Sequence, residues 1–192
     1  MLAVHSLKKE TLNAYLGSII ALGSWAMLFI TFLASYGVLR VQAETWISFR
    51  SWPALFWLAS GNTLVILLSS WTYAAGSRAI RLDRVAQAQK KISIAIFFGG
   101  IFLILQLFVW KLLTTQGLSV KSDIASSMLY VLSGMHGIHV LAGLTALIFV
   151  LRQINRKKVS AQNPHLIILV GFFWHFLTVV WCLFFAIIFV IN

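Results

Sequence analysis

Long apolar stretches alternate with short polar segments along the whole chain of 192 residues. Each stretch reaches or exceeds the ~20 residues that a helix needs to cross a ~30 Å hydrocarbon core. In hydrocarbon every backbone N–H and C=O must be paired within the protein, which leaves helices or a closed barrel, and barrel strands would alternate polar and apolar residues. The pattern therefore predicts an all-α, polytopic integral membrane helix bundle. Its five transmembrane helices are expected at approximately 14–39, 53–76, 92–113, 126–151 and 166–191.

Composition supports a membrane location and leaves no room for a separate soluble domain. Apolar residues make up 60% of the chain and charged residues only 10%, far below the ~25% that is usual in soluble domains. We therefore expect residues 1–192 to form a single transmembrane domain. The segments 77–91 and 152–165 are expected to be loops that let neighbouring helices pack antiparallel.

The net charge of +11 would suit a nucleic-acid-binding protein, so the placement of the basic residues decides the interpretation. Most of the fifteen Lys and Arg residues fall on the side of the membrane that carries the N-terminus. They are Lys8, Lys9, Arg78, Arg81, Arg84, Lys90, Lys91, Arg152, Arg156, Lys157 and Lys158. The positive-inside rule then places the N-terminus in the cytoplasm and the C-terminus outside, and the basic surface faces anionic lipid rather than nucleic acid.

The predicted helices contain polar side chains but no Asp or Glu. A pump or antiporter usually needs a carboxylate within the membrane as its proton relay, so a stand-alone transporter is disfavoured. The polar residues instead recur at helical spacing, as with Asn62, Ser69 and Tyr73 on the second helix. Amide and hydroxyl groups in lipid pair across helices, so this pattern indicates faces that pack on other helices.

Three histidines lie at or near membrane depth, His136 and His139 on the fourth predicted helix and His175 on the fifth. Histidines from two helices can ligate a b-type haem or a metal, provided that they lie at matching depth. Counted from the inner ends of the two helices, the depth of His175 matches those of His136 and His139 only loosely. We therefore interpret all three as packed, hydrogen-bonded residues, and we predict no catalytic, cofactor-binding or metal-ligating residue in the chain. A di-haem cytochrome b membrane anchor remains an alternative.

Four sequence blocks between about residues 61 and 189 resemble, in order, those of subunit III of haem-copper terminal oxidases. The His-Gly-Ile-His-Val block at 136–140 and the Trp-His-Phe block at 174–176 are the most specific. The family includes a five-helix form, which agrees with the predicted helices. The matching residues are expected to be family-motif and subunit-interface positions. They are Asn62, Thr63, Ser69, Ser70, Gln106, Trp110, His136, His139, Trp174, His175 and Trp181.

This resemblance implies a structural, non-catalytic subunit of an aerobic respiratory oxidase in the bacterial inner (cell) membrane. Such a subunit packs on the catalytic subunit I and on subunit II, and these partners would hold the haem and copper. The complex, supplied with electrons by cytochrome c or by quinol, would reduce oxygen and pump protons. This chain would stabilise it, support proton uptake and hold phospholipid in a cleft between its first two helices and the others. Trp57, Arg78 and Arg81 are the candidate lipid contacts.

Two positions of the chain depart from the family pattern. Val109 stands where the family has a Glu, and Thr178 stands where it commonly has an Asp. Any role of those carboxylates is therefore not carried over to this chain. The departures keep open a second hypothesis, an accessory subunit III-like protein of nitric oxide reductase.

Overall fold

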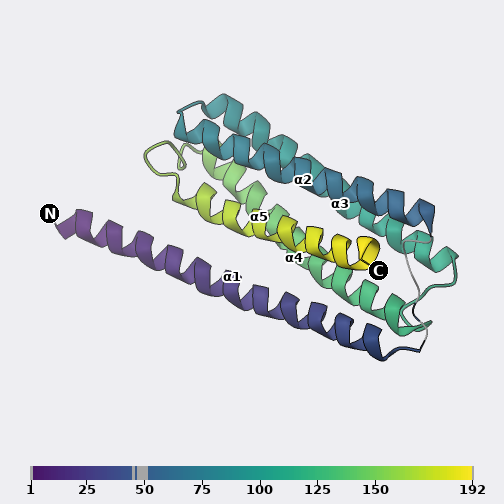
Figure 1. Cartoon of the computed structure of the whole chain (residues 1–192). Coiled ribbons are helices and arrows are strands. Elements are labelled where there is room, and N and C mark those ends of the chain that lie inside the picture. The colour runs from purple at the N-terminus through teal and green to yellow at the C-terminus, as the bar shows by residue number, and fades with distance from the viewer. Residues whose placement is uncertain (1, 45, 47–51, 192) are drawn as a thin grey trace.

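The computed structural model describes residues 2–44, 46 and 52–191, and side chains are described from residue 12 onward. Within these residues the chain forms five long helices. They are α1 (Leu2–Gln42), α2 (Pro53–Arg81), α3 (Val85–Thr115), α4 (Ile124–Asn155) and α5 (His165–Phe185), which continues as a π-helical turn over Ala186–Val190. All five are long and apolar enough to cross a membrane, and they form one bundle (Figure 1). The predicted all-α membrane bundle with five spanning helices is confirmed.

The helices are longer than the apolar stretches that predicted them. α2 runs on to Arg81 and α3 begins at Val85, so a turn at 82–84 replaces the expected loop at 77–91. Asp83 makes this reversal in the left-handed region, with a φ of 56°. α4 likewise extends to Asn155, which leaves 156–164 as its connection to α5. An apolar stretch marks only the part of a helix that lies in hydrocarbon, and polar residues extend the same helix toward the headgroups.

The most extensive packing in the bundle is between α2 and α3. α2 also packs against α5, and α4 completes the group by contacting α3 and α5. α1 packs on α4 and α5 and lies at the edge of the bundle (Figure 1). Only 6% of the most apolar window of α1 is buried, against 44% for α5. Among the described residues α1 and α2 therefore do not form the expected pair apart from the other helices, because α2 packs against α3 and α5 in the core of the bundle.

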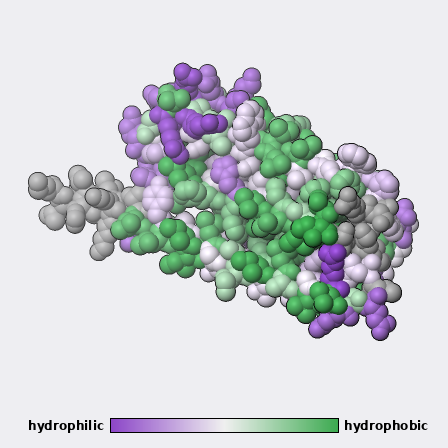
Figure 2. Space-filling view, viewed as in Figure 1, coloured by the Kyte–Doolittle hydropathy of each residue, from purple (hydrophilic) through white to green (hydrophobic). Residues whose placement is uncertain are grey.

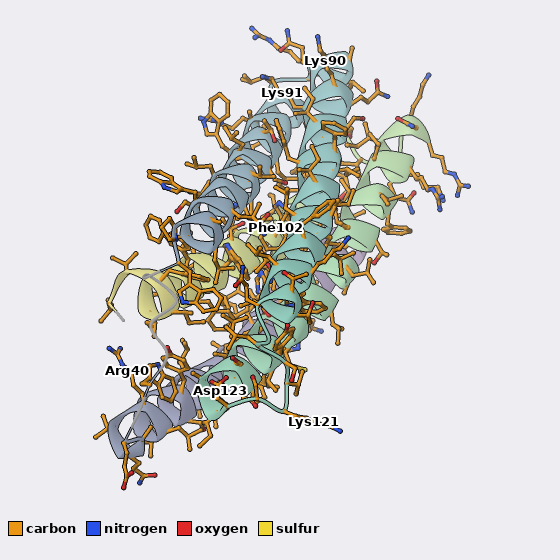
Figure 3. All side chains as sticks on the ribbon, turned by 90° about the vertical axis from the view of Figure 1, so that its right-hand side faces the viewer. Arg40, Lys90, Lys91, Phe102, Lys121 and Asp123 are labelled. Atoms are coloured by element: carbon orange, nitrogen blue, oxygen red, sulfur yellow. The ribbon has the colours of Figure 1, made fainter. Side chains whose placement is uncertain are left out.

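Hydrophilic side chains gather toward the two ends of the bundle, and hydrophobic surface covers much of the part between them (Figure 2). Lys90 and Lys91 lie at one end, near the α2–α3 turn. Arg40, Lys121 and Asp123 lie at the opposite end (Figure 3). We call the end formed by the α2–α3 turn and the α4–α5 connection the basic end. By the positive-inside rule the basic end is predicted to face the cytoplasm.

The indole of Trp174 on α5 lies where three helices meet. Its side chain is fully buried, and it faces Gly99 on α3 and Gly143 on α4. A Cβ atom at Gly143 would come within 2.8 Å of Trp174 Cε3, and one at Gly99 would come within 3.0 Å of Trp174 Cη2. A side chain at Gly143 would overlap the indole and one at Gly99 would crowd it, so the two glycines allow α3 and α4 to approach Trp174.

The start of α4 is capped by the side chain of Asp123. Its Oδ1 accepts a hydrogen bond from the backbone N–H of Ser126 at 2.8 Å, and its Oδ2 accepts one from Ser122 Oγ at 2.9 Å. Burial by itself raises the pKa of the Asp123 carboxyl, but the hydrogen bonds from Ser126 and Ser122 outweigh it and hold the pKa below its usual range. The ionised carboxylate therefore satisfies an N–H group that the first turn of the helix leaves unpaired.

Gly143→Ala is expected to loosen the contact between α4 and α5, because the added methyl group overlaps Trp174. The expected loss in the free energy of unfolding is about 1–3 kcal/mol, the usual cost of overpacking a filled interior. Gly137→Ala is the matched control on the same helix, since nothing lies within 4 Å of the position that its methyl group would take. Thermal unfolding in detergent compares the two variants, and equal melting temperatures would contradict this account of the contact.

Asp123→Ala removes the cap of α4 and is expected to cost about 1 kcal/mol of stability at pH 7. Because the pKa of Asp123 is lowered in the folded protein, its contribution is complete above the unfolded-state value of ~3.9 and is lost as the pH falls through the folded-state value. The gap in melting temperature between wild type and variant should therefore close only in acid. A gap that stays constant from pH 7 to about pH 2 would count against this role.

Candidate functional site

Two polar side chains of α2 bond directly to α3 in the interior of the bundle. Asn62 Nδ2 donates to Gln106 Oε1 at 3.2 Å, and Ser69 Oγ donates to the backbone carbonyl of Ala95 at 2.6 Å. Asn62, Ser69 and Gln106 are all buried. An unpaired amide or hydroxyl group would be costly at this depth, so these bonds favour one register of α2 against α3.

The adjoining side of α2 bonds to α5. Trp181 Nε1 donates to Thr63 Oγ1 at 3.1 Å, and Ser70 Oγ lies 2.6 Å from His175 Nδ1, within hydrogen-bond distance. Thr63 and Ser70 are seven residues apart, which places them on the same side of α2 about two turns apart. Four of the family-motif residues therefore join one pair of helices at two depths in the bundle.

A third link joins α3 to α4 through the indole of Trp110. Its Nε1 donates to Ser133 Oγ at 3.0 Å, and Ser133 Oγ in turn donates to the backbone carbonyl of Leu129 at 2.6 Å. Trp110 was expected from the sequence as a motif residue, but Ser133 was missed. Its only sequence signal is a hydroxyl group within an apolar stretch, three residues before His136.

His136 on α4 is enclosed by aromatic rings. It is fully buried, and neither ring nitrogen has a hydrogen-bond partner among the described residues. Its ring centroid lies 5.2 Å from that of Trp181 and 5.9 Å from those of Phe102 and Phe184. The prediction that all three histidines are hydrogen-bonded is therefore wrong for His136, which packs among aromatic rings instead.

The other two histidines face different helices. His139 Nδ1 donates to the backbone carbonyl of Met135 at 2.7 Å, and its ring packs against Trp25 and Phe29 of α1. His175 is paired instead with a serine of α2. Two axial ligands of one haem must face a shared space, and these imidazoles do not. The described part of the chain also has no group of three or more His, Cys, Asp or Glu residues that could hold a metal ion.

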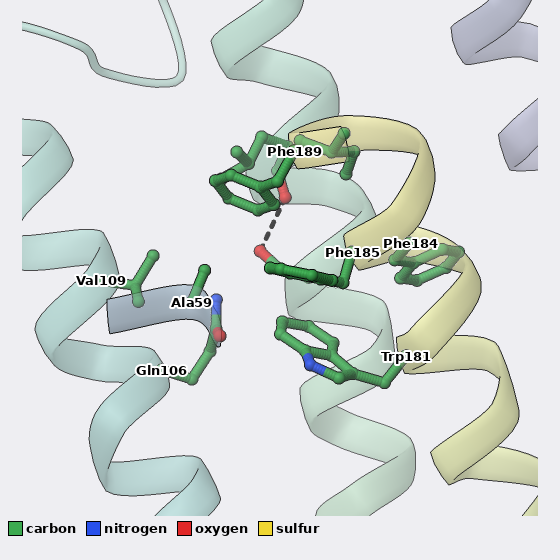
Figure 4. Close-up of a pocket in the computed structure, with 10 residues that line it drawn as sticks. Ala59, Gln106, Val109, Trp181, Phe184, Phe185 and Phe189 are labelled. Carbon is green, nitrogen blue, oxygen red and sulfur yellow. Dashed lines mark hydrogen bonds between the residues drawn. The ribbon is translucent and has the colours of Figure 1, made fainter. Parts of the chain in front are cut away.

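A small cavity adjoins the position where the family pattern has a glutamate. It lies between α2, α3, α4 and α5, beside Gln106 and Val109 (Figure 4). Its volume is about 20 Å³, roughly the room that one water molecule needs. Val109 is buried, and at the second departure Thr178 Oγ1 donates to the backbone carbonyl of Trp174 at 3.1 Å. Both positions therefore carry neutral side chains that the bundle accommodates.

The family-motif residues lie inside this chain rather than on a polar outer surface. Asn62, Thr63, Ser69, Gln106, His136, Trp174 and Trp181 are buried. Ser70, Trp110, His139 and His175 are half-buried. Their hydrogen bonds described above join helices of the same chain or lie within one helix, so they organise its interior.

The three candidate lipid contacts do not form one site. Trp57 is 71% exposed and lies near the start of α2. Arg78 and Arg81 are exposed in the last turn of the same helix. At 1.5 Å per residue, Trp57 and Arg78 are about 30 Å apart along the axis, roughly the thickness of the hydrocarbon core. Trp57 and the arginines therefore belong to opposite ends of the bundle.

Comparison with known proteins gives a consistent family assignment. The family model for cytochrome c oxidase subunit III matches residues 11–192. A protein of Nocardia farcinica named probable cytochrome c oxidase subunit 3 is 31% identical, over 98% of this chain and 93% of its own length. Cytochrome c oxidase subunit 3 of Thermostichus vulcanus is 28% identical, over 92% of this chain and 87% of its own.

A relative from a quinol oxidase also matches. Cytochrome bo(3) ubiquinol oxidase subunit 3 of Pseudomonas aeruginosa is 28% identical, over 68% of this chain and 63% of its own length. The family model covers all five helices but for the first residues of α1. The resemblance found in the sequence is thereby confirmed: the chain belongs to the cytochrome c oxidase subunit III family.

Proposed function

We propose that this haem-copper oxidase subunit III is a non-catalytic subunit that stabilises its complex. In this proposal it packs on the catalytic subunit I and on subunit II, holds phospholipid and supports proton uptake. The haem and copper belong to the partner subunits, and this chain contributes a packed helix bundle beside those subunits. The observation that carries the proposal is the use of the family-motif residues as internal links between α2, α3, α4 and α5.

These internal links are made by uncharged groups. Amide, hydroxyl, indole and imidazole groups pair with one another or with backbone carbonyls. Catalysis of electron or proton transfer within the bilayer usually requires a redox centre or an ionisable relay. Groups that are already paired serve instead to hold helices in register. This arrangement supports a structural role.

Contact with the larger subunits is assigned to apolar outer faces, because most motif side chains are buried inside the chain. On α3, Ile104, Leu107 and Phe108 are more than half exposed. On α4, Ile138 and Leu141 are also more than half exposed. Such side chains pack equally well on lipid tails or on a partner's helix, so the internal bonds serve to present these faces in a fixed arrangement.

Support of proton uptake is assigned to the basic end. Asp83 in the α2–α3 turn and His165 at the start of α5 place a carboxyl group and an imidazole at this end. His165 Nδ1 lies 3.4 Å from the hydroxyl of Tyr15 on α1. The surrounding Lys and Arg residues attract anionic lipid headgroups and buffer anions to this surface.

Two observations favour this role over the alternatives. The relatives are named as subunits of cytochrome c and ubiquinol oxidases, which supports an oxidase rather than a nitric oxide reductase as the parent complex. The di-haem anchor requires facing histidines, and His139 and His175 pack toward α1 and α2 respectively.

Mild detergent extraction of an affinity-tagged copy of the chain is expected to bring down a large subunit that contains haem and copper. Mass spectrometry of the associated chains and the visible spectrum of the preparation measure this. Oxidase prepared without the chain should keep its initial rate of oxygen consumption but lose activity sooner than the complete complex. The catalytic centre is intact in that preparation, whereas the stabilising subunit is absent.

The tagged Gly61→Ala variant is the control, because nothing lies within 4 Å of the position that its methyl group would take and it is not on the proposed contact faces of α3 and α4. We expect Gly143→Ala to recover less of the large subunit than Gly61→Ala, because only Gly143→Ala disturbs the contact with Trp174. Recovery of a haem-free homo-oligomer from wild-type cells would refute the proposed function.

A further inference from the structure

A groove runs between α2 and α5 at the basic end of the bundle. Its volume is about 380 Å³. One wall is formed by α2 through Ala74, Ser77, Arg78 and Arg81, and the other is formed by α5 through Ile167, Ile168, Gly171, Phe172 and His175. The groove therefore has basic and hydroxyl groups on α2, toward the end of the bundle, and a largely apolar wall on α5.

A glycine and a buried tyrosine pack α2 against α5 behind the groove. A Cβ atom at Gly171 would come within 3.0 Å of Tyr73 Cε1, so the glycine allows α5 to lie close to the tyrosine ring. Tyr73 is fully buried, and its hydroxyl donates to the backbone carbonyl of Ile167 at 2.8 Å. This bond ties α2 to α5 behind the groove, so the opening is a feature of the packed bundle.

The charge of the groove suits an anion. Arg78 and Arg81 are three residues apart in the last turn of α2, so their side chains project from the same side of the helix. The described lining residues include no Asp or Glu that would neutralise them. A guanidinium group can form two parallel hydrogen bonds to one phosphate, and Ser77 adds a hydroxyl donor one residue before Arg78.

The depth of the groove suits a lipid. The arginines lie at the end of a membrane-spanning helix, where phosphate groups of the bilayer are found. From there, Ile168 and Phe172 extend the α5 wall toward the middle of the bundle, four residues apart. A charged group at the mouth and an apolar wall below it match the headgroup and the first part of an acyl chain.

We infer that the groove between α2 and α5 binds one anionic glycerophospholipid, with its phosphate at Arg78 and Arg81 and an acyl chain along Ile168 and Phe172. The inference rests on the proposed function, since it locates the phospholipid that this subunit would hold. It differs from the expected cleft between the first two helices and the others. Two arginines without a lining carboxylate favour a net negative headgroup over a zwitterionic one.

The test uses the intact oxidase complex, purified with wild-type and variant subunits under the same detergent washing. Phosphatidylglycerol retained per complex is measured by native mass spectrometry and by lipid extraction. Arg78→Gln combined with Arg81→Gln is expected to lower this retention about tenfold or more, because each arginine near the surface strengthens the attraction to an anionic lipid. Arg152→Gln is the matched control, since Arg152 is an exposed arginine on α4 that does not line the groove.

A second variant separates a lipid from a free phosphate ion. Ala74→Phe fills the groove beside the arginines while leaving both guanidinium groups in place. It is expected to lower retention of phosphatidylglycerol as well, whereas a site for free phosphate would be unaffected. Added inorganic phosphate should not displace the lipid, because it lacks the acyl chain that contacts α5.

The inference is overturned if the double arginine variant retains as much phosphatidylglycerol as wild type, or if Arg152→Gln loses as much. The lipid assignment would likewise be overturned if the Ala74→Phe variant retained as much phosphatidylglycerol as wild type, or if inorganic phosphate displaced phosphatidylglycerol from the complex. Recovery of the larger subunits is recorded in each preparation. A wild-type complex that assembles fully but retains no phosphatidylglycerol refutes only the groove, whereas a chain that brings down no oxidase subunit refutes the proposed function.

Discussion

Inside a bilayer no water can replace a missing hydrogen bond, and the arrangement of these helices depends on this constraint. α2 carries several polar side chains through the membrane, and each side of the helix has a different partner. Asn62 and Ser69 pair with α3, while Thr63 and Ser70 pair with α5. Rotating or sliding α2 would leave these groups unpaired in hydrocarbon. The bonds therefore favour one arrangement of helices that apolar packing alone would leave poorly defined.

Close packing adds a second determinant in the same core. Trp174 fills the space between α3, α4 and α5, and two glycines make room for it. His136 packs nearby among aromatic rings without a hydrogen-bond partner among the described residues. These contacts join the helices by close van der Waals packing, whereas the polar side chains of α2 join them by hydrogen bonds. Together they hold the helices in one packed interior, which agrees with the proposed supporting role.

Membership of the family does not require the two carboxylates that its pattern contains. The chain has Val109 and Thr178 at those positions, and the bundle accommodates both. Val109 borders a cavity of about 20 Å³, so the interior remains nearly filled. The helical links made by amide, hydroxyl and indole groups are independent of these two positions. The fold of this chain therefore rests on the neutral polar links and not on carboxylates at these two positions.

The sequence by itself determined the fold class, the number of spanning helices and the family. Apolar stretches longer than a bilayer leave few alternatives to helices, and the motif residues around His136 and Trp174 are specific enough to indicate the family. The sequence also predicts that Arg78 and Arg81 lie at a membrane surface, because their position at the end of a long apolar stretch depends only on the local order of residues.

The tertiary structure alone decided which helices are neighbours and what each polar residue contacts. Sequence periodicity shows that Ser70 lies on a polar side of α2, but it cannot show that this side meets His175 of α5. It also suggested hydrogen bonds for His136, which packs instead among rings from three other helices. The groove at Arg78 is likewise invisible in the sequence, since its other wall is formed by residues of α5 that are far away in the chain. Such pairings arise between residues far apart in the chain, and their geometry depends on how whole helices pack.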